Sequence, residues 1–180
     1  MRDLNIIVAC DQQGGYAKKG KIPWSFKADW EWFKVQTAGA YCIMGRRTYE
    51  DILERKCKRL KTKKDLLNPE EHLLEDRFSI VLTKQDIPII GAQRRSSLRE
   101  ALDYGCEHPK MPIFILGGYH LWMEAYPQVK KVYQTVIDHK YGCDRFFNIA
   151  YLDKNYKIIK GEGPKKINQK TLYWTIWERK

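Results

Sequence analysis

The sequence predicts an α/β fold built on a mixed, mostly parallel sheet. Short runs rich in β-branched and aromatic residues alternate with segments of helical periodicity, as expected when helices connect parallel strands. After Gln128 the strand-like runs follow one another without a helical crossover, so the last strands are expected to pair antiparallel. The length of 180 residues suits a single domain, which we expect to span residues 1–180.

The expected elements follow in order along the chain. Each strand-like run is short, apolar and bounded by turn-forming residues. The expected strands are Asn5–Cys10, Tyr41–Met44, Ser79–Thr83, Gly91–Arg94, Ile113–Leu116, Val132–Ile137, Tyr156–Ile159 and Leu172–Trp177. The expected helices are Phe26–Thr37, Thr48–Leu60, Leu98–Tyr104 and His120–Ala125. Ser97 followed by Glu100 is typical of a capping box, which predicts the start of the third helix.

The formal net charge of +11 is concentrated in one segment. Residues 55–64, RKCKRLKTKK, hold seven Lys and Arg and no acid, inside a helix-prone insertion at residues 53–73. Such a run gives salt-dependent affinity for phosphates, so contact with nucleic acid through Arg55–Lys64 is one hypothesis. A charged run is more often a solvated helix face, but because this run precedes Arg77 we prefer the hypothesis that it attracts an anionic tail of the ligand.

Other composition features exclude several classes of protein. The five cysteines are widely spaced and form no CxxC pair, which favours free thiols in a reducing compartment. The four histidines lack ligand spacing, so no metal site is expected. The apolar runs are too short to cross a membrane, and a strand-like run begins near Met1, where a signal peptide would lie. We therefore expect a cytosolic protein without a membrane segment.

One carboxylate lies on the apolar face of the first predicted helix. Helical spacing places five residues on that face: Phe26, Asp29, Trp30, Phe33 and Thr37. A carboxylate in apolar surroundings is costly unless a polar group docks there, and its pKa should be raised. This makes Asp29 a candidate to hold and help protonate a nitrogen-rich ligand. Alternatively, Asp29 is an acid in the first helical turn, stabilised by the helix dipole.

Three strand ends carry cations or potential donors. Arg46-Arg47 stand at the start of a helix, where cations oppose the helix dipole unless an anion binds there. Gly117-Gly118 follow another strand and allow a ligand to approach the backbone closely, and Thr83-Lys84 follow a third. Carboxyl ends of parallel strands meet at one sheet edge, so the pattern indicates a phosphate-bearing ligand. The arginines could instead be solvated, and a Gly-Gly pair is usually only a turn.

Taken together, these motifs resemble the dihydrofolate reductase family. The matching strings cover nearly the whole chain in the family's order: IIVACDQQGGYAKKGKIPW, ADWEWFK, IMGRRTYEDI, DRFSIVLTK, ILGGYHLW and VYQTVIDHKYGCDRFF. The resemblance implies a one-domain fold with an eight-stranded mixed sheet and about four flanking helices. It implies NADPH-dependent reduction of 7,8-dihydrofolate, polyglutamylated or not, to tetrahydrofolate for one-carbon metabolism. We expect the enzyme to be a monomer.

The resemblance also implies roles for individual residues. Asp29 should bind the pterin and favour protonation at N5, with Thr135 in its hydrogen-bond network and Trp24 holding a water nearby. Arg77 should bind the α-carboxylate of the substrate. The expected substrate-binding residues are Ile7, Val8, Ala9, Asp29, Trp30, Phe33, Ile52, Arg77, Leu116 and Thr135. The expected cofactor-binding residues are Ala9, Tyr16, Ile22, Gly45, Arg46, Arg47, Thr48, Leu82, Thr83, Lys84, Leu116, Gly117, Gly118, Tyr119, His120, Leu121 and Trp122.

Three alternatives remain open from the sequence. The pyrimidine reductase of riboflavin synthesis shares the fold and NADPH, but Trp24, Asp29 and Thr135 together fit a pterin site better. A nucleic-acid-binding protein on a reductase-like scaffold would use the basic run. A scaffold without turnover is the third, because a fold does not by itself imply an activity.

Overall fold

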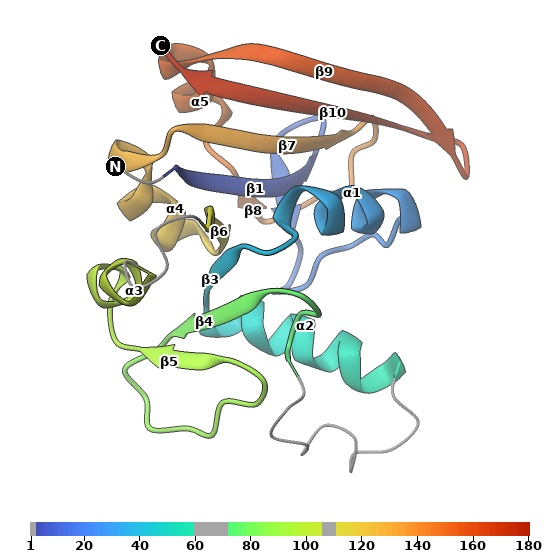
Figure 1. The fold of residues 1–180 in the computed structure, drawn as a ribbon. Coiled ribbons are helices and arrows are strands. Elements are labelled where there is room, and N and C mark those ends of the chain that lie inside the picture. The colour runs from blue at the N-terminus through green and yellow to red at the C-terminus, as the bar shows by residue number, and fades with distance from the viewer. Residues whose placement is uncertain (1–2, 60–71, 106–110) are drawn as a thin grey trace. The chain divides into compact units, whose positions relative to one another are not determined.

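The computed structural model describes residues 3–59, 72–105 and 111–180 (Figure 1). Eight strands belong to one mixed sheet, and two short strands form a second sheet. The described residues divide into two compact units. Unit 1 comprises Thr37–Pro127, and unit 2 comprises Asp3–Gln36 together with Gln128–Lys180.

Unit 1 contains four parallel strands in the order β5-β4-β3-β6. Their side chains form an apolar core, in which Ile43, Met44, Ile80 and Ile115 are fully buried. Burial on both faces explains why these strands are continuous apolar runs. The strands are β3 (Tyr41–Gly45), β4 (Phe78–Leu82), β5 (Gln93–Arg95) and β6 (Ile113–Gly117). The helices are α2 (Arg46–Arg59), α3 (Leu98–Gly105) and α4 (Tyr119–Ala125), and a 3-10 turn, η2 (Tyr126–Gln128), follows α4.

Unit 2 contains strands in the order β1-β7-β10-β9. β1 (Leu4–Asp11) pairs parallel with β7 (Lys131–Ile137), and β10 (Lys170–Arg179) pairs antiparallel with β7. β9 (Tyr156–Ile167) forms a long antiparallel hairpin with β10, drawn in orange and red in Figure 1. The remaining elements are α1 (Lys27–Thr37), α5 (Ile149–Asn155) and the short pair β2 (Gly15–Ala17) and β8 (Arg145–Phe146).

The predicted architecture is confirmed: the sheet is mixed and its C-terminal strands are antiparallel. All eight predicted strands and all four predicted helices are present, with ends that differ by a few residues; β9 is the exception, since it runs on to Ile167. The sequence missed β2 and β8, which are too short to show alternation. It also missed α5, so there are five α-helices among the described residues and not four. The cap of α5 is a local signal that was overlooked, because the Asn148 side chain accepts a hydrogen bond from the Tyr151 N–H.

The predicted capping box at the third helix is present with a shift of one residue. Ser97 Oγ accepts a hydrogen bond from the Glu100 N–H at 3.2 Å, as expected of an N-cap. The Glu100 carboxylate reaches back to the N–H and hydroxyl of Ser96 rather than to Ser97.

The predicted insertion at residues 53–73 is only partly described. Its first residues, up to Arg59, continue helix α2. Residues 60–71 lie outside the described part of the chain, so the rest of the insertion stays a prediction, as does the single domain over residues 1–180. Among the described residues, no helix is long and apolar enough to cross a membrane.

Candidate active site

Asp29 lies in the first turn of α1 and is half-buried. Its Oδ1 atom accepts a hydrogen bond of 2.6 Å from Thr135 Oγ1, on the buried strand β7. Burial raises the pKa of the Asp29 carboxyl above its ordinary value, while the hydrogen bond from Thr135 and the nearby indole N–H of Trp174 oppose the rise. The structure therefore brings Asp29 and Thr135 together as predicted, and adds Trp174, which the sequence did not suggest.

A buried cluster rich in tryptophan includes Trp174, the neighbour of this acid. Trp24 and Trp174, each 7% exposed, pack with Ile137 and Leu172 in one buried cluster. Trp32, on α1, packs against the cluster and lies 6.5 Å from Trp174 between ring centroids. The predicted Trp24 therefore lies in the same buried cluster as Trp174, the tryptophan whose indole acts on Asp29.

The other aromatic residues of α1 lie apart from this cluster. Trp30 and Phe33 stack on each other with ring centroids 5.0 Å apart and an interplanar angle of 19°. Trp30 remains 38% exposed. A partly exposed pair of stacked rings offers a flat apolar surface, which suits an aromatic ligand.

Strand β1 contributes residues on both of its faces. Ile7 and Val8 are both buried, and Ala9 pairs with Thr135 in the parallel register of β1 and β7. Neighbouring strand residues point to opposite faces. The side chains of Ile7 and Val8 therefore cannot both line one pocket, and one of them can contribute only its backbone.

The loop Gln12–Lys21 is held by hydrogen bonds near both of its ends. At its start, Asp11 is buried and accepts hydrogen bonds from the backbone of Gln13 and Gly15. Near its end, the Lys19 N–H donates to Asp144 Oδ2 at 2.8 Å. Within and beside the loop, Tyr16 is half-buried on β2 and Ile22 is 41% exposed.

Gly15 holds the loop close to the segment before β8. A Cβ atom at Gly15 would lie 2.5 Å from the Cβ of Cys143, closer than real Cβ contacts. A larger residue there would push the loop off this segment. Asp11 and Cys143 therefore hold this loop in place, although no motif in the sequence points to either residue.

In unit 1, three parallel strands end side by side. Gly45 at the end of β3 pairs with Leu82 at the end of β4, and Met44 pairs with Gly117 at the end of β6. The residues that follow each strand therefore start from the same edge, as the sequence predicted. They are Arg46, Arg47 and Thr48 after β3, Thr83 and Lys84 after β4, and Gly118, Tyr119 and His120 after β6.

The cations at this edge differ in their availability. Arg46 forms an ion pair of 2.7 Å with Glu50, one turn further along α2. Arg47 and Lys84 are exposed, and neither has a carboxylate partner within the described residues. Arg47 and Lys84 are thus ready to bind an anion, whereas Arg46 is already partly neutralised.

The two glycines after β6 have different surroundings. Gly117 has a φ of +136°, and a Cβ there would lie 3.1 Å from the Trp122 ring. A Cβ at Gly118 would meet no atom within 4 Å, so this backbone faces open space. The peptide bond between them is cis. The local structure therefore requires glycine at position 117, whereas at Gly118 a ligand can approach the backbone closely.

Arg77 is 6% exposed and is held by unit 1 itself. Its Nε donates to Thr37 Oγ1 at 2.7 Å, and its NH1 donates to the backbone carbonyl of Glu75. These contacts fix the direction of the guanidinium group. The sequence singled out Arg77 but not Thr37 as its partner.

The remaining predicted residues of unit 1 surround the same strand ends. Tyr119 and His120 are exposed in the first turn of α4, with their rings in an edge contact. The half-buried members are Gly45, Thr48, Ile52, Leu82, Thr83 and Leu116, and the buried members are Leu121 and Trp122.

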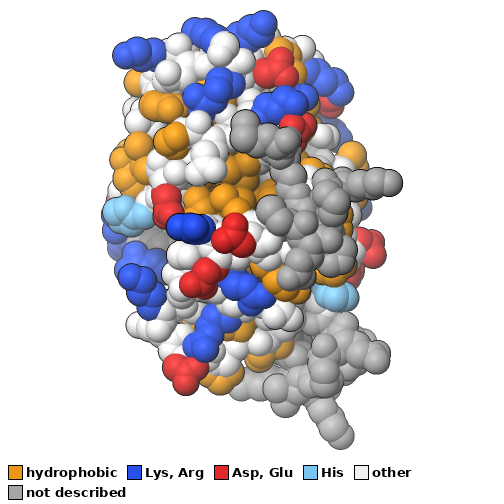
Figure 2. All heavy atoms as spheres, turned by 60° about the vertical axis from the view of Figure 1, so that its left-hand side comes forward, with side chains coloured by type: hydrophobic (Ala, Val, Ile, Leu, Met, Phe, Trp, Pro, Cys, Tyr) orange, Lys and Arg blue, Asp and Glu red, His pale blue; other side chains and the backbone are white. Residues whose placement is uncertain are grey.

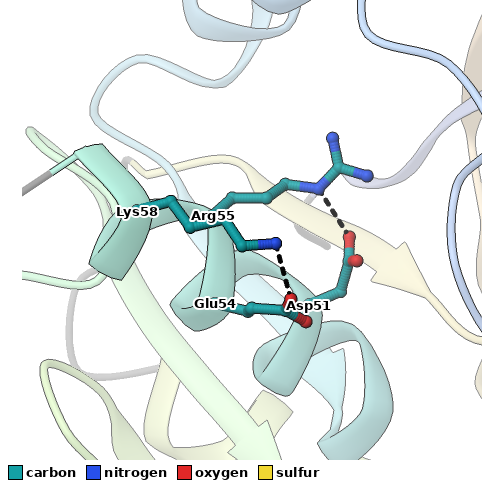
Figure 3. Close-up of polar contacts among 4 residues, drawn as sticks. All are labelled: Asp51, Glu54, Arg55 and Lys58. Atoms are coloured by element: carbon teal, nitrogen blue, oxygen red, sulfur yellow. Dashed lines mark hydrogen bonds and ion pairs between the residues drawn. The ribbon is translucent and has the colours of Figure 1, made fainter.

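The described part of the basic run carries compensated charge. Arg55 pairs with Asp51 at 2.9 Å, and Lys58 pairs with Glu54 at 2.7 Å, each one helical turn apart (Figure 3). On the face shown in Figure 2, Lys and Arg side chains are interspersed with Asp and Glu. This arrangement favours a solvated helix face over a nucleic-acid interface.

Comparison with known proteins gives one consistent family. The family model described as dihydrofolate reductase matches residues 3–179. Dihydrofolate reductase of Staphylococcus haemolyticus is 29% identical over 179 residues, covering 98% of this chain and 95% of that protein. Dihydrofolate reductase of Schistosoma mansoni is 33% identical over 170 residues, covering 86% of this chain and 83% of that protein.

A solved structure agrees. Dihydrofolate reductase from Enterococcus faecalis, complexed with NADP(H) and RAB-propyl, is similar with a TM-score of 0.77 and 25% identity. The similarity covers 98% of this chain and 96% of that chain. The chain therefore belongs to the dihydrofolate reductase family and has that family's activity, the NADPH-dependent reduction of dihydrofolate to tetrahydrofolate.

Proposed function

We propose that Asp29 is the acidic group that binds the pterin ring and promotes its protonation at N5. The observation that supports this role is the 2.6 Å hydrogen bond from Thr135 to a carboxyl whose pKa is raised by burial. The two oxygens of the carboxylate can accept one hydrogen bond each from N3 and the 2-amino group of the pterin, because these are parallel donors and Oδ1 keeps a lone pair beside its bond from Thr135. A raised pKa brings the group closer to working pH, where proton transfer is most effective.

The division of roles follows from this arrangement. NADPH, when bound, supplies the hydride to pterin C6. Thr135 orients the carboxylate by donating to one of its oxygens, and the cluster around Trp24 excludes bulk water. Trp30 and Phe33 offer the flat surface for the benzoyl part of the substrate. Strand β1 at residues 7–9 forms the adjacent wall, with side chains from one face of the strand and backbone from the others.

The strand ends of unit 1 fit the phosphates of NADPH. Arg47 and Lys84 are exposed cations without carboxylate partners in the described residues, and Gly118 leaves its backbone open. We assign the pyrophosphate to Arg47, Thr48 and Gly118, and the 2′-phosphate to Lys84 with Thr83. This assignment explains a preference for NADPH over NADH, because only NADPH carries the 2′-phosphate.

Arg77 is the proposed partner of the substrate's α-carboxylate. Contacts to Thr37 and to the Glu75 carbonyl hold one side of the guanidinium group and fix its orientation. A fixed planar fork suits a carboxylate better than a flexible ammonium group does.

A further proposal about the substrate is that the enzyme also accepts folates with a longer, anionic polyglutamate tail. The run 55–64 should attract the extra glutamates of a polyglutamylated folate, since Lys and Arg dominate it. Changing Lys58, Arg59, Lys61 and Lys63 to Gln should raise the KM of a triglutamate substrate several-fold more than that of the monoglutamate. Equal changes for both substrates would reject this role. Arg59 lies at the limit of the described helix, and positions 61 and 63 lie outside the described residues.

Two further expectations about the enzyme are proposals as well. We propose a monomer, because each predicted role is filled from one chain, and sedimentation velocity would test it. We propose a cytosolic location, which the free thiols of Cys10, Cys42, Cys57 and Cys143 favour. Imaging of the tagged protein would test it.

The role of Asp29 is tested by Asp29→Asn with Glu31→Gln as its matched control. Both changes replace one carboxylate of α1 by an amide, but Glu31 is exposed and paired with Lys27 at 3.6 Å. Asp29→Asn should reduce kcat at neutral pH by roughly a hundredfold or more, with activity recovering toward acid pH. Glu31→Gln should keep the original rate. Full activity in Asp29→Asn, followed by NADPH absorbance, would exclude the proposed role.

A further inference from the structure

Trp174 carries a polar group that the proposed mechanism does not use. The side chain is 7% exposed, and its Nε1 atom is buried without a hydrogen-bond partner among the described residues. Buried donors of this kind are rare, because leaving one unpaired costs free energy. We therefore expect the indole N–H of Trp174 to donate a hydrogen bond to a nearby acceptor when the enzyme works.

The register of the sheet places this donor next to the acid. Trp174 on β10 stands directly opposite Thr135 on β7, and cross-strand partners share one face of the sheet. Thr135 already donates to Asp29. The indole of Trp174 also stabilises the charged form of Asp29, although less than the hydroxyl of Thr135 does.

Among the described residues, the three groups near Asp29 on neighbouring strands are neutral at working pH. Thr135 lies on β7 and Trp174 on β10. On β1, burial raises the pKa of the Cys10 thiol to about 12, so this group stays protonated. The proton affinity of Asp29 is therefore set by burial and by hydrogen-bond donors rather than by a nearby ion pair.

We propose that Trp174 is a positioning residue for Asp29, whose indole N–H is a second donor to the carboxylate beside Thr135. Two donors from adjacent strands fix the carboxylate more firmly than one and stabilise its ionised form. The inference rests on the proposed role of Asp29 in catalysis. It assigns Trp174 to tuning the pH at which the enzyme works.

Trp174→Phe tests the proposal, with Trp177→Phe as its control. Both changes remove an indole N–H from β10 and keep an aromatic ring, but the Trp177 N–H is bonded to Gln134 and Thr175. The hydride-transfer rate, measured with NADPH and deuterated NADPH, falls as pH rises through the pKa of Asp29. Loss of the Trp174 donor should move this midpoint upward by about one pH unit, and Trp177→Phe should leave it unchanged.

An unchanged midpoint in Trp174→Phe would overturn the proposal. If Trp174→Phe does not fold, the wild-type protein still gives an answer. The Trp174 indole N–H proton signal in its NMR spectrum should titrate with the midpoint of Asp29, and the titration should vanish in Asp29→Asn. A signal that does not respond to pH in the wild type would equally overturn the proposal. An inactive Asp29→Asn with an unaltered Trp174→Phe profile would reject this inference alone and leave the role of Asp29 intact.

Discussion

The surroundings of Asp29 in unit 2 and the strand ends of unit 1 that carry Arg47 and Lys84 (the cationic edge) prepare charged groups for binding in opposite ways. Asp29 is half-buried, lies beside the indole of Trp174 and accepts a hydrogen bond from the Thr135 hydroxyl. Arg47 and Lys84 are exposed and carry charges that no carboxylate in the described residues neutralises. Burial changes how tightly a group holds a proton, whereas exposure leaves a charge ready for an anion. Substitutions in unit 2 should therefore alter pH dependence, and those in unit 1 should alter affinity and salt dependence.

The largest effect should come from the glycine that unit 1 requires. Gly117→Ala places a Cβ 3.1 Å from the Trp122 ring at a φ of +136°, and should lower the free energy of unfolding by about 2–3 kcal/mol. Gly118→Ala meets open space and should cost less than ~0.5 kcal/mol, while weakening NADPH binding. Urea denaturation and cofactor titration measure the two effects. Equal stability losses would show that the two glycines are not structurally different.

The next effect concerns the buried cation of unit 1. Arg77→Lys keeps the charge but loses the planar fork and the contact to Thr37. It should raise the KM for dihydrofolate roughly 10- to 100-fold, ~1.4–2.8 kcal/mol. A reduced pteridine without the glutamyl tail should show no such change. If the KM rises equally for both substrates, Arg77 acts through the structure of unit 1 and not by binding the carboxylate.

The exposed cations should have a smaller effect that depends on salt. Arg47→Gln and Lys84→Gln should each weaken NADPH binding about tenfold at low ionic strength, and less at high salt. Lys84→Gln should leave NADH binding nearly unchanged, because NADH lacks the 2′-phosphate. Fluorescence titration with both cofactors measures these values. An equal loss of affinity for NADH would show that Lys84 does not bind the 2′-phosphate.

The smallest effect is a gain in stability. The pKa of Asp29 is raised in the folded protein, so the folded state binds its proton more tightly than the unfolded state does. Stability therefore falls as pH rises from the ordinary value of 3.8 through the folded pKa. Asp29→Asn removes this penalty and should be about 1 kcal/mol more stable at neutral pH, with no gain below pH 3.8. A loss of stability at neutral pH would show that the carboxylate is favourable to folding.

Local patterns in the sequence were sufficient for most of the fold. The strands of unit 1 are buried on both faces, which makes them continuous apolar runs such as Ile113–Leu116. The cationic edge was predicted for the same reason, since parallel strands such as β3 and β4 end together and their following residues share an edge. The positions of Arg47 and Lys84 at this edge could therefore be predicted from the order of strands and following residues in the sequence.

The surroundings of Asp29 depend on strand register, which the sequence does not fix. Alternation along β10 indicates that Leu172 and Trp174 are buried and Tyr173 is not. It does not show that Trp174 stands opposite Thr135, because that pairing depends on where β10 meets β7. Similarly, the contact of Arg77 with Thr37 joins residues 40 positions apart. The partners that tune the site were missed for this reason.

A direct measurement of the proton affinity of Asp29 tests the account most sharply. The ¹³C signal of its carboxyl, assigned by comparison with Asp29→Asn, is followed by NMR across the pH range. We expect a midpoint above the ordinary aspartate value of 3.8. A midpoint at or below that value would mean that burial does not control this carboxylate, and would contradict the account.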